Sequence, residues 1–146
     1  MAIKLGMEGK LYRNTADYAT PTWVEMQNVK DLTLSVEANE ADATTRGNNG
    51  WEAIVAALKK GSIEFEMVWD TEDADFTAIQ QAFFGNTTIE FAVMDGAVAS
   101  SGSQGLRATM TVTNFSRNEP LQEVMSVSVT IKPTYAANAP EWMTVA

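Results

Sequence analysis

Alternation of apolar and polar residues with a period of two dominates this sequence. In residues 62–70 (SIEFEMVWD), Ile63, Phe65, Met67 and Trp69 take every second position, and mostly polar residues stand between them. This is the pattern of a β-strand with one buried and one wet face. Sheets with one wet face are usually antiparallel, so the sequence predicts a mainly β, antiparallel protein.

The same reasoning predicts further strands along the chain, roughly six or more in total. These strands cover residues 23–37, 88–94, 106–115 and 123–132. In the last of them, alternation places Met125, Val127, Val129 and Ile131 on the dry face. Pro133 then ends the strand, and we expect the tail beyond it to lie on the surface.

The period changes from two to helical spacing in residues 71–86 (TEDADFTAIQQAFFGN). Phe76 and Ile79 begin an apolar stripe with that spacing. Thr71 or Asp73 can cap the start, where acidic residues also favour the helix dipole. A Gly-Asn pair follows the stripe and is a common helix end. The sequence therefore predicts one α-helix over about residues 74–84.

The chain length predicts a single folded unit. A chain of 146 residues can bury a proper core as one domain. We therefore predict one domain, residues 1–146, built as an antiparallel β-sandwich or a partly open barrel with one flanking helix.

Composition excludes most catalytic and metal-binding chemistry. The chain has no cysteine and no histidine, so it lacks thiolate ligands and imidazole bases. Glu64 and Glu66 lie about 7 Å apart on one strand face, a spacing that glycosidases use, but a solvated sheet face is the favoured interpretation. The acids of residues 70–75 enter the predicted helix and lack the glycine of a calcium loop. We predict no enzyme, no cofactor and no metal site.

The charge balance argues against binding of nucleic acid. The net charge is −9, and ten basic residues stand against nineteen acids. A protein that grips phosphates needs clustered Lys and Arg, whereas an acidic surface keeps a protein soluble and repels polyanions. The N-terminus lacks a signal peptide pattern, and no run approaches the ~20 apolar residues of a spanning helix. We expect a soluble protein with no membrane association, used without export.

A long polar excursion, residues 40–53 (EADATTRGNNGWEA), interrupts the strand pattern. It contains Arg46, which either pairs with an acid of its own chain or with a neighbouring subunit. It ends at Trp51, which begins the segment WEAIVAALKK. Residues 51–60 fit a short helix or an extended segment, and the pattern leaves both open.

Three segments taken together resemble the phage tail tube proteins, the major tail proteins of long-tailed phages. The resemblance covers about residues 23–142 and rests on the order and spacing of these segments around one helix. The segments are EADATTRGNNGWEA, LKKGSIEFEMVWDTEDADFTAIQQAF and GLRATMTVTNFSRNEPLQEVMSVSVTIKPTY.

The resemblance implies both architecture and role. Tail tube proteins are sandwiches or barrels with a flanking helix; six copies close a ring, and rings stack into a hollow tube through which DNA is ejected. A long extended loop, here about residues 38–60, reaches the adjacent ring, which favours the extended form of residues 51–60. The resemblance further implies other tail proteins at the tube ends, a place in the virion tail, and assembly in the host cytoplasm.

Two groups of residues follow as candidates for these contacts. The excursion supplies the candidate inter-ring residues, and the wet sheet faces supply the candidate lumen residues, which DNA would pass without specific binding. The inter-ring candidates are Glu40, Asp42, Thr44, Thr45, Arg46, Asn48, Asn49 and Trp51. The lumen candidates are Glu64, Glu66, Thr109, Thr111, Ser126, Ser128 and Thr130.

Two other functions are compatible with the residues. A β-sandwich binding module could use Trp51 or Trp142 to stack a carbohydrate or contact a protein ligand. A hydrolase could use Glu64 and Glu66, but the absence of histidine and cysteine makes this the weakest of the three hypotheses.

Overall fold

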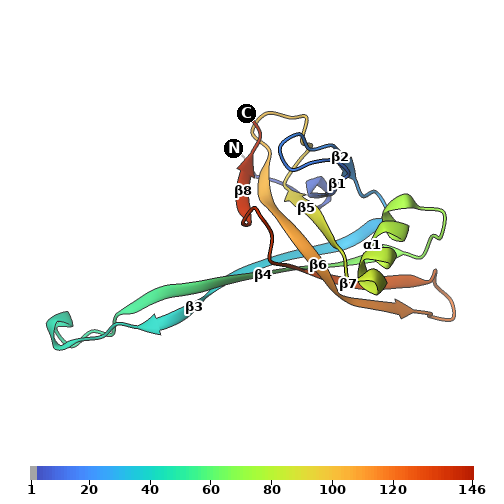
Figure 1. Cartoon of the computed structure of the whole chain (residues 1–146). Coiled ribbons are helices and arrows are strands. Elements are labelled where there is room, and N and C mark those ends of the chain that lie inside the picture. The colour runs from blue at the N-terminus through green and yellow to red at the C-terminus, as the bar shows by residue number, and fades with distance from the viewer. Residues whose placement is uncertain (1–2) are drawn as a thin grey trace.

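The computed structural model describes residues 3–146, which form eight strands, one α-helix and two short 3₁₀ turns (Figure 1). The strands are β1 (Lys10–Asn14), β2 (Trp23–Glu25), β3 (Val29–Asp42), β4 (Ile54–Val68), β5 (Thr88–Met94), β6 (Gln104–Asn118), β7 (Ser126–Pro133) and β8 (Glu141–Thr144). The helix is α1 (Ala74–Gly85), and the 3₁₀ turns are η1 (Gly6–Glu8) and η2 (Arg46–Asn48).

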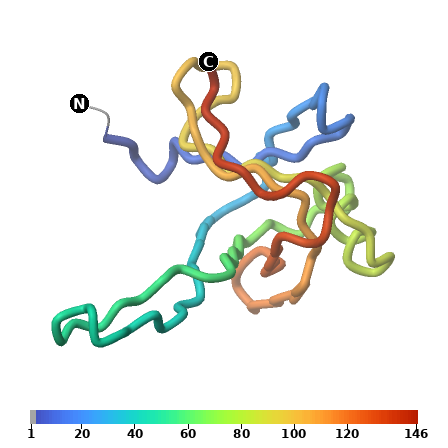
Figure 2. Tube along the Cα trace, turned by 60° about the vertical axis from the view of Figure 1, so that its left-hand side comes forward, coloured from blue at the N-terminus to red at the C-terminus, as the bar shows by residue number. Residues whose placement is uncertain are grey.

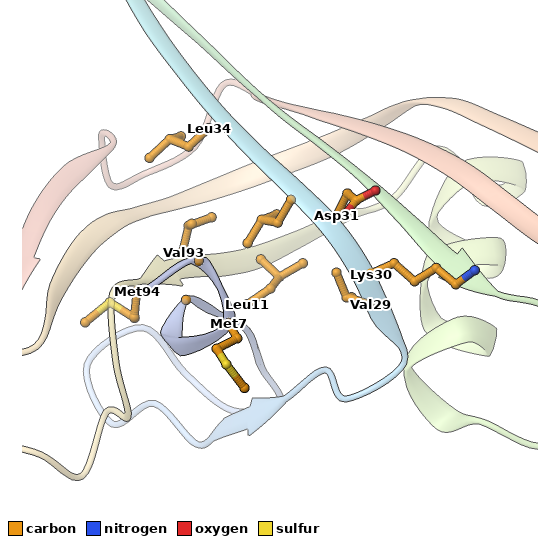
Figure 3. Close-up of a pocket in the computed structure, with 11 residues that line it drawn as sticks. Met7, Leu11, Val29, Lys30, Asp31, Leu34, Val93 and Met94 are labelled. Atoms are coloured by element: carbon orange, nitrogen blue, oxygen red, sulfur yellow. The ribbon is translucent and has the colours of Figure 1, made fainter. Parts of the chain in front are cut away.

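All eight strands belong to one antiparallel sheet with the order β2-β1-β5-β6-β7-β4-β3, and β8 pairs with the start of β6. The predicted mainly β, antiparallel fold with one flanking helix is confirmed. The sheet is continuous and curls, which is closer to the partly open barrel than to two separate sheets. Figure 3 shows the result: Leu11 and Val93 lie around a pocket of about 600 Å³ together with Val29 and Leu34 of β3, from the far end of the strand order.

The core lies on the inner face of this sheet, under α1. Ile63, Phe65 and Met67 of β4 are almost completely buried, and so are the alternating residues Val127 and Ile131 of β7. The period-two prediction for both strands is therefore confirmed. The apolar faces of β1, β5 and β6 complete the same core.

Helix α1 is fixed to the sheet by aromatic packing and one buried ion pair. Phe76 packs edge-on against Trp69 and tilted against Phe115 of β6. At the first turn, Arg13 of β1 pairs with Asp75 at 2.9 Å. Burial raises the pKa of Asp75, and the hydrogen bond from Arg13 opposes that shift.

The ends of α1 follow the sequence signals. Asp73 is the N-cap, and its carboxylate accepts the backbone N–H of Asp75, so Asp73 rather than Thr71 fills this role. The helix ends at Gly85, and the C-cap residue Asn86 adopts the left-handed conformation with φ of 54°. The predicted range of 74–84 is one residue short.

Two features differ from the sequence-based expectations, and a third agrees with the resemblance. The tail is not merely a surface segment, because Glu141–Thr144 forms β8 beside β6. The predicted long loop, about residues 38–60, is a paired hairpin in which β3 continues to Asp42 and β4 begins at Ile54. Within the segment 51–60, residues 54–60 are extended, as the resemblance favoured, and pair with β3 except at a bulge around Ala57 and Leu58; residues 51–53 belong to no strand.

Truncation of Phe76 tests the packing of α1. Phe76 is 1% exposed, so Phe76→Ala leaves a cavity and is expected to lower the free energy of unfolding by about 3–5 kcal/mol. Phe84 on the same helix is 70% exposed and is the matched control, with an expected loss of about 1 kcal/mol or less. Urea denaturation measures both, and equal losses would contradict this packing.

Candidate assembly surfaces

A two-stranded arm extends from the body of the protein. Strand β7 pairs with β4 only from Ile63 to Val68, so the preceding part of β4 has β3 as its single partner. We call residues 36–61 the arm. Figures 1 and 2 show the arm projecting away from the sheet, with its turn at the far end.

The tip of the arm is an ordered turn. Asp42 accepts the backbone N–H of Thr44 at 2.8 Å, and the Thr44 hydroxyl accepts the N–H of Ala53 at 2.9 Å. The 3₁₀ turn η2 follows, and the chain reverses through Asn49 and Gly50, both with positive φ. The two hydrogen bonds of Thr44 and the reversal give this polar segment a defined shape.

All the candidate inter-ring residues lie together at this tip. Glu40 and Asp42 end β3, and the others lie in the turn; Asn48 is half-buried and the rest are exposed. Arg46 forms no salt bridge with any of residues 3–146, so the intramolecular pair considered for it is not formed. Their contact with another ring stays a prediction.

The arm also exposes large apolar side chains. Trp51 is 78% and Leu58 is 79% exposed, and Val36, Ile54 and Val55 are about half exposed. A two-stranded hairpin is marginally stable in water by itself, and contiguous exposed apolar surface usually marks a protein interface. These exposed apolar side chains make the arm a candidate contact surface.

The lumen candidates lie on the sheet face opposite the core. Across β4 and β7, Glu64 stands opposite Thr130 and Glu66 opposite Ser128, so four candidates form two adjacent rows. Ser126 continues this face but is buried. Glu64 is exposed and Glu66 half-exposed, so neither carboxyl group has the apolar pocket that a glycosidase acid needs.

Strand β6 extends the polar rows with residues that sequence reasoning missed. Asn114 stands opposite Thr130 and Ser116 opposite Ser128. A bulge between Val112 and Asn114 shifts the alternation by one residue, which turns Phe115 to the core and Asn114 to the wet face. The sequence NFS after an alternating run is the signal for that shift.

Thr109 and Thr111 precede the bulge and form a separate part of the same face. Thr111 stands opposite Lys132 of β7, and Thr109 stands opposite Glu90 of β5. Both threonines are half-buried. The seven lumen candidates are therefore a group of five around β4 and β7, and a pair near the end of β7.

The arm, the curled sheet and the single helix also occur together in known proteins. The sequence profile described as phage tail tube protein matches residues 9–134. The chain belongs to this family. It is thus a structural protein of phage tail tubes, which agrees with the resemblance seen in the sequence.

Solved structures of other tails share the fold at low sequence identity. One is the tail of an empty gene transfer agent (GTA) particle with C6 symmetry, with TM-score 0.73, 17% identity, and coverage of 99% of this chain and 100% of the other. Another is the SPP1 tail tube, with TM-score 0.71, 14% identity, and coverage of 89% and 75%. The baseplate of the anti-feeding prophage matches with TM-score 0.59, 11% identity, and coverage of 94% and 91%. No curated protein has significant sequence similarity to the chain.

Within the described part of this tail tube protein, residues 3–146, two classes of site are not found. No helix there is both long and apolar enough to span a bilayer. No group of three or more acidic side chains there is arranged to hold a metal ion. Trp51 and Trp142, the alternative residues for stacking a sugar, line different pockets.

A buried arginine joins the C-terminal strand to the sheet. Arg107 of β6 donates to Glu90 of β5 and to the carbonyl of Tyr18, and its guanidinium lies 3.7 Å from the centre of the Tyr18 ring. The Tyr18 hydroxyl donates to Glu141 of β8 at 2.9 Å, and this hydrogen bond raises the pKa of Tyr18. Sequence reasoning missed this cluster, because its members are far apart in the chain.

The turn at the tip of the arm should lower the pKa of Asp42 in a way that depends on Thr44. The hydroxyl and the backbone N–H of Thr44 hold the pKa of Asp42 below its ordinary value. Thr44→Val should raise that pKa toward the ordinary value, and Thr45→Val, one residue further along the exposed turn, should leave it unchanged. NMR titration of the Asp42 carboxyl measures both shifts, and equal values in wild type and Thr44→Val would contradict the turn geometry.

Loss of the Arg107 cluster should loosen β8. Arg107→Met leaves the buried carboxylate of Glu90 without its partner and is expected to cost about 3–5 kcal/mol in urea denaturation. Arg117→Met is the control, because its pair with Glu119 is half-exposed and should cost about 1 kcal/mol or less. Faster proteolysis at the C-terminus in Arg107→Met only is the second readout; similar losses in both variants would refute the role of Arg107.

Proposed function

We propose that this tail tube protein assembles into six-fold rings that stack into a hollow tube, with the arm as the ring-to-ring contact. The observation that carries the proposal is the arm itself, a hairpin with exposed Trp51 and Leu58 that projects beyond the part of the sheet paired to β7. A monomer gives this apolar surface no partner, whereas stacking covers it. The C6 symmetry of the related GTA tail supports the six-fold order.

The polar face of the sheet supports a water-filled lumen. The paired rows of Glu, Ser, Thr and Asn on β4, β7 and β6 present hydrogen-bonding groups and acids, and the chain carries a net charge of −9. Like charges repel phosphate, so DNA would pass this wall without specific binding. The role is structural rather than enzymatic.

The proposed tube has partners at its ends and a place in the virion. Other tail proteins close the two ends of the tube, and the assembled tail is part of the virion. In this proposal, assembly takes place in the host cytoplasm.

Removal of the arm tip tests the stacking role. Asp42 and Ile54 are register partners, so an Asn-Gly turn can replace residues 43–53 and still close the hairpin. The shortened protein should stay folded, because the deleted segment contributes nothing to the core. Negative-stain electron microscopy should then show single rings or short stacks in place of tubes.

Point variants separate the chemistry of the tip from its length. Trp51→Ala should shorten the tubes, and Arg46→Ala should do so more weakly, because truncation of the tryptophan removes more apolar contact area. Tyr135→Ala, which alters a fully exposed residue away from the arm, is the control. If the protein with the shortened arm still forms tubes of normal length, the arm tip is not the ring-to-ring contact.

A further inference from the structure

A groove at the base of the arm concentrates positive charge in an acidic protein. It lies where β7 ends beside β4 and β8, and it has a volume of about 320 Å³. Three of the ten basic residues of the chain line it, against nineteen acids overall. We call it the lysine groove, formed by Val36, Lys59, Lys60, Lys132, Pro133 and Trp142.

The positive charges of the groove lysines are not neutralised by strong ion pairs within residues 3–146. Within residues 3–146, neither Lys59 nor Lys132 forms a salt bridge. Lys60 pairs with Glu37 at 3.1 Å, but both side chains are mostly exposed, so that pair contributes little. One acid, Glu141, also lines the groove, but its carboxylate already accepts from Tyr18 and lies 3.8 Å from Arg107.

The groove also has an apolar surface of fixed shape. Trp142 is 59% exposed, and its indole N–H donates to Gln104 at 2.9 Å, which holds the ring in place. Val36 of β3, which also lines the groove, is 55% exposed. A ligand for this groove therefore combines an apolar side chain with carboxylates.

An exposed turn of this chain, separate from the arm, has that combination. The turn between β6 and β7, residues 119–124 (EPLQEV), carries Leu121, which is 99% exposed, and Val124, which is 63% exposed. Glu119 and Glu123 flank Leu121, and both are exposed. We call this segment the acidic turn.

The acidic turn cannot reach the lysine groove of its own chain. The turn precedes the first residue of β7, and the groove lies at its last residues, Lys132 and Pro133. Eight residues of strand hold the two about 26 Å apart. Strand β7 is paired on both sides, so this separation is rigid.

We propose that the acidic turn of one copy docks into the lysine groove of the next, with Leu121 against Trp142 and Val36 and the flanking glutamates near the lysines. The contact is head-to-tail, and contacts of this kind close into rings or continue as filaments. It uses a surface separate from the arm tip. The inference rests on the self-assembly proposed above and names a second interface for it.

Crosslinking tests the contact directly, because the chain contains no cysteine. Leu121→Cys and Val36→Cys are prepared as separate proteins, mixed, assembled and treated with a short bismaleimide. A covalent dimer is expected. Val55→Cys replaces Val36→Cys in the matched control, since both valines lie on the arm with 54–55% exposure and only Val36 lines the groove. The control should give at least about fivefold less dimer, as expected for about 1 kcal/mol of contact preference.

Charge exchange gives a second readout. Lys132→Glu and Glu123→Lys should each reduce the dimer yield roughly two- to fivefold, the effect of an exposed charge pair. When both changes are made, the reversed charge pair should restore the dimer yield. If the groove instead bound DNA or another polyanion, the second change would not restore the yield.

The outcomes distinguish this inference from the proposed function. If wild-type tubes form but Leu121→Cys links to Val55→Cys rather than Val36→Cys, the groove contact is wrong and the tube function stands. If the Leu121→Cys and Val36→Cys proteins link in solution while no tubes form, the groove contact stands and the tube function fails.

Discussion

The early end of the β4–β7 ladder determines the shape of this molecule. Pairing stops at Ile63 and Ile131, and β7 ends two residues later at Pro133, which has no backbone N–H to donate. On one side of this point, β4 is paired with both β3 and β7, and the sheet covers a core. On the other side, β3 and β4 have only each other, so any residue placed there is exposed unless another molecule covers it.

The sequence predicted well the parts of the fold that local periodicity describes. Period two identified the buried faces of β4 and β7, and the 3.6 period identified α1, because burial of each face depends on spacing along one segment. Long-range pairing was harder. The single curled sheet, the bulge after Val112 and the pairing of β8 with β6 depend on which strands meet, and the residues of one segment do not specify its partner.

The candidate sites show the same division. The inter-ring candidates are contiguous in sequence, so their gathering at the arm tip could be predicted. The cluster around Arg107 joins residues 89 positions apart, and each member looks like an ordinary strand or loop residue in isolation. The arm was expected to be a loop because its tip is polar and rich in turn formers. In WEAIVAALKK, which also fits a helix, the strand begins only at Ile54, where pairing with β3 starts.

Electrostatics limits how copies with a net charge of −9 can associate. Self-repulsion opposes assembly and falls with added salt over a Debye length of about 8–10 Å. Apolar contacts such as those offered by Trp51 and Leu121 do not suffer this repulsion, and the lysine groove is a place where the local charge is reversed. An acidic subunit can therefore assemble if its contacts combine apolar anchors with localised basic residues, while the polar sheet face keeps its acids free.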